Sequence, residues 1–132
     1  MSAWERDRRV DLVRQFWERL EARDFHAAGD LMHEDFLLEW PQSGERIRGR
    51  ENFLEVQRNY PGEWHIRLTR VLVDGEHLVS EVRVDFPDRT ETGITFFELR
   101  NGRISRAVEY WPDPFEPAEW RKAWVEPNAG RS

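Results

Sequence analysis

The sequence contains no cysteine, a single lysine and no long apolar run. Without cysteine, neither a disulfide bond nor a thiolate metal site can form. No apolar stretch approaches the roughly 18 residues that span a membrane, and the first residues lack the apolar core of a secretion signal. We therefore expect a cytoplasmic protein. The single lysine, Lys122, stands beside 19 arginines, a bias that is typical of a G+C-rich genome.

The composition is that of one acidic globular domain. The chain has 132 residues and a net charge of −6, and it has no basic block that would indicate binding to nucleic acid or to an anionic membrane. A chain of this length buries roughly two-thirds of its surface on folding, enough for one core. Charged residues make up 35% and aromatic residues 13% of the chain, with seven tryptophans. We therefore expect a charged surface over an aromatic core, and neither nucleic acid nor a membrane as partner.

The first sixty residues have the periodicity of helices. Ser2 and Glu5 have the spacing of a capping box, and the apolar residues that follow recur at helical intervals. This pattern predicts a long amphipathic helix over residues 3–22. The remaining elements predicted here are helices over 25–32 and 50–60, a strand over 36–40 and a short strand at 45–48.

The periodicity changes to that of strands after residue 62. Apolar residues alternate with polar ones over 64–72 and again over 78–86, which indicates two strands joined by a hairpin turn at Asp74-Gly75. Two further strands are predicted over 92–100 and 103–111, joined by a tight turn at Asn101-Gly102.

This order of elements predicts an α+β fold. Helices would pack on one face of a strongly curved antiparallel or mixed sheet and leave a conical cavity between the two layers. We expect a single domain over residues 1–132, with its core in 8–112 and a tail over 113–132. The tail is rich in proline, and Pro117 can begin a last helical turn. Its tryptophans, Trp120 and Trp124, would act as a lid on the chain's own sheet or as a dimer contact.

Five short motifs in this order resemble the SnoaL-like branch of the nuclear transport factor 2-like superfamily. The resemblance spans about residues 8–112. It implies a cone-shaped fold and a homodimer, and this fold is used by isomerases, hydrolases, cyclases and proteins without catalysis. The motifs are Phe16-Trp17, Leu31-Met32-His33-Glu34-Asp35-Phe36, Ile47-Arg48-Gly49-Arg50-Glu51-Asn52, Asn101-Gly102-Arg103-Ile104 and Glu109-Tyr110-Trp111.

Comparison with ketosteroid isomerase argues against its chemistry here. In that enzyme a carboxylate base and two oxyanion donors act on the substrate. The resemblance places the base at Trp40, the tyrosine donor at Phe16 and the carboxylic acid donor at Thr95. None of these three residues can take the corresponding role.

Limonene-epoxide hydrolase is a closer match in its charged residues. Its Arg-x-Asp pair resembles Arg83 and Asp85, and its second carboxylate resembles Glu109. The resemblance implies that one carboxylate activates water while another protonates the epoxide oxygen, with the arginine biasing their pKa values. The tyrosine and asparagine that orient the water in that family fall on Leu38 and Trp40, so half of the water-binding residues are missing.

The direction of Arg83 and Asp85 depends on strand register. A two-residue turn at Asp74-Gly75 sets Ile66 opposite Arg83 and mixes charge into the apolar face. A loop one residue longer sets Ile66 opposite Val84 and turns both charged residues outward. Because a slip of one residue inverts every side chain, the sequence leaves both arrangements open.

Glu109 is the strongest catalytic candidate, since it lies in an otherwise uncharged row between Ala107 and Trp111. A carboxylate in an apolar wall has the profile of a general acid or base; the alternative is a structural glutamate. A small apolar or aromatic ligand would stack on aromatic side chains. The candidate ligand-binding residues are Phe16, Trp17, Trp40, Phe53, Phe97 and Trp111.

Three functions remain open at this stage. The chain is a cofactor-free isomerase, cyclase or hydrolase acting through Glu109 with Asp85 and Arg83, a non-catalytic ligand-binding module, or a dimeric domain whose cavity its own aromatic residues fill. We expect no metal, because no histidine, aspartate or glutamate residues have ligand spacing on one element. The predicted homodimer would use an open sheet face that carries Val71, Val73 and Val79 among charges.

Overall fold

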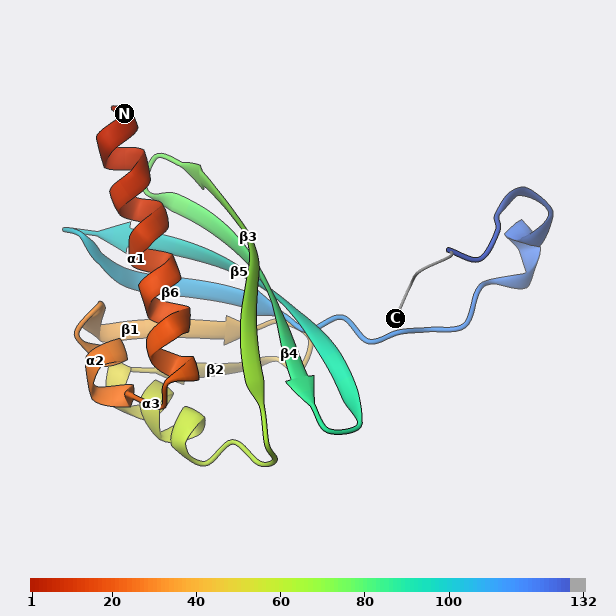
Figure 1. The fold of residues 1–132 in the computed structure, drawn as a ribbon, viewed down its shortest axis with the longest axis horizontal. Helices are drawn as coiled ribbons and strands as arrows, with labels where there is room; N and C mark the ends of the chain where they lie inside the picture. Colours follow the sequence, from red (N-terminus) through yellow and green to blue (C-terminus); the bar gives the residue numbers. More distant parts are fainter. Residues whose placement is uncertain (129–132) are drawn as a thin grey trace.

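The computed structural model describes residues 1–128 and confirms the α+β prediction (Figure 1). Three helices precede or interrupt the strands, and a short 3-10 helix follows them. The elements are α1 (Ala3–Glu21), α2 (Phe25–Gly29), β1 (Met32–Trp40), β2 (Glu45–Arg48), α3 (Arg50–Arg58), β3 (His65–Asp74), β4 (His77–Phe86), β5 (Arg89–Arg100), β6 (Arg103–Tyr110) and η1 (Glu119–Trp124).

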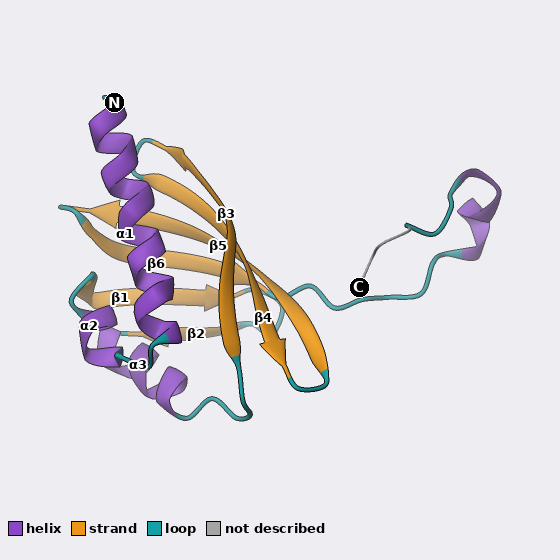
Figure 2. Cartoon of the chain, in the orientation of Figure 1, coloured by secondary structure: helices purple, strands orange, loops and turns teal. Residues whose placement is uncertain are grey.

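The six strands form one curved, mixed sheet that does not close into a barrel. Their order is β2-β1-β6-β5-β4-β3, in which β1 and β6 run parallel and every other neighbouring pair is antiparallel. Figure 2 shows the three α-helices on one side of the sheet, with α1 running across strand β1 at a steep angle. The apolar sides of both layers therefore face each other, and the pocket forms between them.

Helix α1 forms as its sequence predicts. The Ser2 hydroxyl accepts a hydrogen bond from the Glu5 backbone N–H and satisfies one of the free donors at the helix start. One face of the helix carries Val13, Phe16 and Leu20, which are almost wholly buried against the sheet. Burial of each such side chain contributes about 1.5–3 kcal/mol, so the helix is held by packing rather than by helix propensity alone.

Strand β1 is longer than the sequence predicts, and α2 is correspondingly shorter. The helical spacing of Leu31 and Met32 favours a helix to residue 32, but Met32 pairs in parallel with Ile104 of β6 and is fully buried there. The main-chain bonds of this distant pairing outweigh the local helical preference. The strand therefore begins at Met32 and ends at Trp40.

A β-bulge at Thr69 settles the register between β3 and β4. Asp74 pairs with His77, so the turn residues are Gly75 and Glu76, not the expected Asp74-Gly75. The pairing shifts by one residue between Leu68 and Arg70 and then sets Ile66 opposite Val84. The sequence left two arrangements open, and the one that forms is therefore the one in which Arg83 and Asp85 of β4 face outward.

The same bulge corrects the expected outer face of the sheet. Beyond it, Val71 and Val73 pack against the core instead of facing outward, whereas Leu72, predicted to be on the apolar face, is 60% exposed. An extra residue in one strand shifts the alternation of its side chains by one. Val79 alone of the three predicted interface valines remains on the outer face, opposite Leu72.

The tail over residues 112–128 extends away from the domain (Figure 1). The predicted helical turn forms as η1, but Trp120 and Trp124 are 75% and 79% exposed, so their packing on the chain's own sheet was wrongly predicted. Pro112, Pro114 and Pro117 lack the backbone N–H that pairing with a strand would need. Residues 129–132, the end of the predicted tail, lie outside the described residues. Over residues 1–128, no helix combines the length and apolarity needed to cross a membrane.

An ion pair between α1 and β3 should make stability depend on pH. The Glu21 carboxylate accepts hydrogen bonds from the Ile66 backbone N–H at 2.7 Å and from the His65 ring at 3.0 Å. Burial tends to raise the pKa of Glu21, but these two bonds outweigh it and lower that pKa from its ordinary 4.5. The hydrogen bond to Glu21 raises the pKa of His65 above its ordinary 6.5.

The two shifts have opposite signs, so the pair stabilises the fold most between these ordinary values. Its contribution falls as the pH drops through the lowered pKa of Glu21, and it falls again as the pH rises through the raised pKa of His65. We expect His65→Gln to lower the melting temperature more at about pH 5.5 than at about pH 9. Exposed His26 provides the control, since His26→Gln should show no such difference; an equal loss for His65→Gln at both pH values would contradict the prediction.

Candidate functional site

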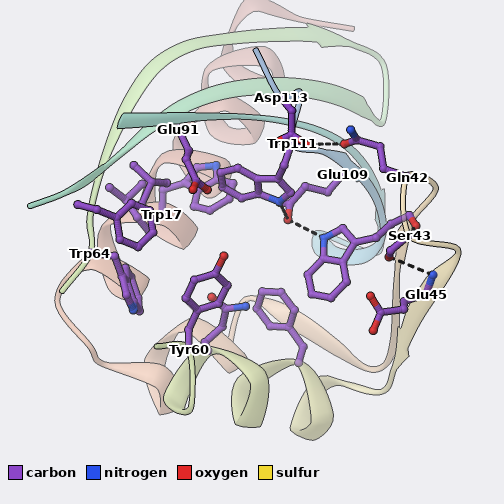
Figure 3. Close-up of a pocket in the computed structure, with 16 residues that line it drawn as sticks. Trp17, Gln42, Ser43, Glu45, Tyr60, Trp64, Glu91, Glu109, Trp111 and Asp113 are labelled. Atoms are coloured by element: carbon purple, nitrogen blue, oxygen red, sulfur yellow. Dashed lines mark hydrogen bonds between the residues drawn. The ribbon is translucent and has the colours of Figure 1, made fainter. Parts of the chain in front are cut away.

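A cavity of about 480 Å³ lies between the helices and the curved sheet (Figure 3). Helices α1 and α3, all six strands and the segments that flank them contribute to its wall, so no single element defines it. The residues that line it are Trp17, Trp40, Gln42, Ser43, Glu45, Phe53, Gln57, Tyr60, Trp64, Ile66, Val84, Phe86, Glu91, Glu109, Trp111 and Asp113.

Four of the six aromatic residues predicted to contact a ligand line this cavity: Trp17, Trp40, Phe53 and Trp111. The other two, Phe16 and Phe97, do not line it and instead form the packed layer behind it, with ring centroids 5.7 Å apart. Phe16 also stacks on Phe53 at 5.8 Å. These two rings are buried because they fill the contact between α1 and β5, so they support the cavity wall without reaching the space.

Glu109 lies in the cavity wall with 7% of its surface exposed. One carboxylate oxygen accepts hydrogen bonds from the indole N–H groups of Trp40 and Trp111, at 3.0 and 2.9 Å. The other accepts one from the Thr95 hydroxyl at 2.6 Å. An indole N–H can only donate, so the carboxylate is the acceptor in both indole bonds. A carboxylate offers about four acceptor positions, and the three hydrogen bonds use three of them.

Strand pairing brings these partners together from distant parts of the chain. Thr95 lies directly opposite Glu109 in the β5–β6 ladder, so its hydroxyl reaches the carboxylate. The six-membered ring of Trp111 lies against Gly93, whose added Cβ would stand 2.7 Å from the indole. Glycine at this position is therefore what allows the Trp111 ring to turn its N–H toward Glu109.

Arg83 and Asp85 lie on the opposite face of β4 and do not line the cavity. Asp85 accepts a hydrogen bond from Arg67 at 2.6 Å and another from Thr90, and these bonds lower the pKa of Asp85 to about 2. Arg83 approaches Glu81 at 3.3 Å, although without hydrogen-bond geometry. The expected grouping of Arg83, Asp85 and Glu109 in one site therefore does not form, because Ser80, Val82 and Val84 are the buried residues of β4 and the residues that alternate with them face outward.

Three further carboxylates line the cavity, and the sequence did not indicate them: Glu45, Glu91 and Asp113. One of them, Glu91, affects the pKa of Tyr60, whose hydroxyl points into the cavity in Figure 3. Burial raises the pKa of Tyr60, and the negative charges of Glu91 and Glu109 raise it further. Over residues 1–128, no three histidine, aspartate or glutamate side chains converge closely enough to hold a metal ion.

The sequence pattern predicted an inward direction for some of the remaining lining residues, but not for others. Trp64, Ile66, Val84 and Phe86 belong to the alternating runs that predicted an inward apolar face. Gln42 and Ser43 lie in the turn after β1, and Gln42 accepts a hydrogen bond from the Trp111 backbone at 2.6 Å. Loop residues reach a site only through the tertiary fold, so no local pattern identifies them.

The sequence profile of the SnoaL-like domain family matches residues 13–107. No curated protein matches the chain. Among solved structures, a "putative ketosteroid isomerase" from Kribbella flavida is 32% identical over 94% of this chain and 92% of its own, with a TM-score of 0.89.

Two further structures extend the comparison. An NTF-2 like protein of unknown function from Burkholderia xenovorans is 29% identical over 94% of this chain and 98% of its own, with a TM-score of 0.79. An LEH-like epoxide hydrolase from M. tuberculosis is 20% identical over 80% of this chain and 84% of its own, with a TM-score of 0.66. Because its sequence identity is only 20%, this last protein supports a common fold and nothing more.

Proposed function

Because the chain belongs to the SnoaL-like domain family of the nuclear transport factor 2-like superfamily, we propose that it binds a small, mostly apolar molecule in the aromatic cavity. The observation that carries this proposal is Glu109, a buried carboxylate fixed in the wall of a cavity that seven aromatic residues also line. The carboxylate would orient the ligand by accepting a hydrogen bond from its polar group. Ligand sites of about 300–1,000 Å³ commonly combine apolar walls with a few fixed polar groups in this way.

The hydrogen-bond partners of Glu109 favour binding over catalysis. Proton transfer is commonly shared between two ionisable groups, one acting as acid and one as base. Here the partners are two indoles and a hydroxyl, and none of them titrates in the ordinary pH range. Three neutral donors hold this carboxylate in a fixed position, which suits recognition of a ligand.

Acid–base catalysis by Glu109 is the second candidate, favoured by the acceptor position that its three hydrogen bonds leave available. The same position could take a proton from a bound substrate, in a fold related to isomerases and epoxide hydrolases. We do not extend steroid isomerisation to this chain, because Trp40, Phe16 and Thr95 occupy the positions of its base and two donors. Turnover lost in Glu109→Gln while ligand binding persists would support catalysis.

A ligand screen by thermal shift and tryptophan fluorescence tests the binding proposal. We expect some small hydrophobic molecules to raise the melting temperature, because binding to the folded state alone stabilises it. Ile66→Phe narrows the cavity and should abolish these shifts. Leu72→Phe is the matched control on the outer face of the same strand and should keep them. Shifts that survive in Ile66→Phe, or their absence from the wild type, would count against the proposal.

We also propose that the outer face of the sheet forms a homodimer. Leu72, Val79, Phe96 and Val108 follow one another across four strands as an apolar row, and Leu72 and Phe96 are 60% and 47% exposed. Such a row with charged neighbours resembles the core and rim of a protein interface. Phe96→Glu should yield a monomer by light scattering, whereas Phe96→Leu should remain a dimer; a wild-type monomer would contradict this proposal.

A further inference from the structure

We propose that the cavity selects an organic cation, a positively charged nitrogen carried by a mostly apolar molecule. This inference rests on the proposed function and adds the charge of the ligand to it. It follows from the kinds of side chain that the described part of the chain places in the cavity, namely carboxylates and aromatic rings without a basic residue among them.

The charge in the cavity wall is negative and largely uncompensated. Among residues 1–128, the lining carboxylates are Glu45, Glu91, Glu109 and Asp113, and no arginine, lysine or histidine of this part of the chain lines the space, although the chain has 20 lysines and arginines. Glu91 is neutralised by Arg89, whose Nε lies 2.6 Å away. The other three carboxylates form no ion pair with any residue in 1–128. A ligand cation would supply the missing charge.

The aromatic part of the wall suits the same ligand. Positive nitrogens bind over aromatic faces, most strongly over tryptophan, and aromatic cages bind quaternary ammonium groups. The cavity has four tryptophans, Tyr60, Phe53 and Phe86. One of these rings already holds a cation on its outer side, where the Arg23 guanidinium lies 3.5 Å from the Trp64 ring centroid. A similar contact from inside the cavity requires a cation that the ligand provides.

Glu109 provides the fixed negative centre for that cation. Its indole partners, Trp40 and Trp111, both line the cavity, so two aromatic rings lie beside the carboxylate that they hold. An ammonium N–H could donate to the remaining acceptor position, and a quaternary nitrogen could use the charge without a hydrogen bond. The raised pKa of Tyr60, caused by burial and then by Glu91 and Glu109 against the opposing charge of Arg89, agrees with a negative potential in this space.

The arrangement also disfavours the opposite ligand charge. A carboxylate or phosphate in the cavity would meet Glu109 and, within residues 1–128, would find no basic side chain in the lining to pair with. Such a ligand would lose its hydration without compensation. A neutral molecule of the same shape would gain only the apolar contacts. The predicted order of affinity is therefore cation, then neutral molecule, then anion.

Three probes of similar shape test this order with the full-length chain. Benzyltrimethylammonium is the cation, neopentylbenzene is its neutral analogue with carbon in place of nitrogen, and phenylmethanesulfonate is the anion. We expect tryptophan fluorescence titration to give about tenfold tighter binding for the cation than for neopentylbenzene, and no saturable binding of the anion. Added salt should weaken the cation's binding more than that of the neutral probe.

Two carboxylate variants test the source of the preference. Glu109→Gln should reduce the ratio of cation to neutral affinity by about tenfold, and Asp113→Asn, at an exposed position, by about twofold to threefold. Glu76→Gln removes an exposed carboxylate outside the cavity and should leave the ratio unchanged. The Asp113 variant keeps the test decisive if the Glu109 variant folds poorly.

The outcomes separate this inference from the proposed function. Equal or tighter binding of neopentylbenzene, or saturable binding of phenylmethanesulfonate, would overturn the cation inference and leave small-molecule binding in place. Failure of all three probes to bind would overturn both. A cation preference that persists unchanged in Glu109→Gln and in Asp113→Asn would show that these carboxylates are not its origin and would also overturn the inference.

Discussion

Replacing Glu109 with alanine is expected to lower the free energy of unfolding by about 3–5 kcal/mol, whereas glutamine should lower it by only about 1 kcal/mol. Alanine leaves the indole N–H groups of Trp40 and Trp111 and the Thr95 hydroxyl without their acceptor. Each buried donor that loses its partner costs about 1–3 kcal/mol. The loss also creates a cavity beside the β5–β6 ladder.

Glutamine preserves nearly all of this arrangement. Its carbonyl oxygen can accept from both indoles as the first carboxylate oxygen does, and its amide N–H can donate to the Thr95 hydroxyl, which is able to accept as well as donate. The side chain keeps its size and loses only its charge. Glu109→Gln is therefore the variant that separates the electrostatic role of this residue from its structural role.

Chemical denaturation of both variants measures the two losses in the free energy of unfolding. In thermal denaturation the alanine variant should melt well below the wild type, since each 1 kcal/mol shifts the melting temperature by about 4 °C in a domain of this size. Glu76→Ala, at an exposed position, is the control for loss of a glutamate and should change stability by less than about 0.5 kcal/mol. Equal losses for Glu109→Ala and Glu109→Gln would mean that the three donors are satisfied in another way.

Replacing Gly93 with alanine is expected to displace the Trp111 ring and to disrupt the cavity. The new Cβ would lie 2.7–3.0 Å from three atoms of the indole, closer than carbon atoms can approach. The ring must move, which breaks its hydrogen bond to Glu109. Overpacking of this kind lowers the free energy of unfolding by about 1–3 kcal/mol. We also expect the affinity for a ligand, measured from the thermal shift, to fall by at least about tenfold, since both the aromatic wall and the carboxylate lose their positions.

A double-mutant cycle with Trp111→Leu tests this mechanism. The smaller side chain removes the indole that the alanine methyl group would strike. Gly93→Ala should therefore cost much less stability in the Trp111→Leu background than in the wild type, with a coupling of about 1 kcal/mol or more. Near-ultraviolet circular dichroism should report the change in Trp111 packing. Additive losses in the cycle would show that Gly93 is needed for a reason other than contact with this ring.

Several features of the fold were predictable from short segments of sequence. Helix α1 begins at the capping box of Ser2 and Glu5, and the β5–β6 hairpin turns at Asn101-Gly102, where both residues adopt positive φ. These features depend on interactions within a few residues, which sequence patterns record directly. The inward direction of Glu109 was predictable for the same reason, because Ala107 and Trp111 mark the uncharged face of its strand.

The composition of the site depended on contacts between residues far apart in the chain. The Thr69 bulge fixed the register of β3 against β4, in which Arg83 and Asp85 face away from the cavity, and only the register of six strands could bring Trp40 and Thr95 to Glu109. A bulge leaves no reliable local signal, and one extra residue reverses every side chain beyond it. The sequence by itself determined the layers, the turns and the inward carboxylate. The tertiary structure decided which side chains surround that carboxylate, because strand pairing over long separations is a property of the whole sheet.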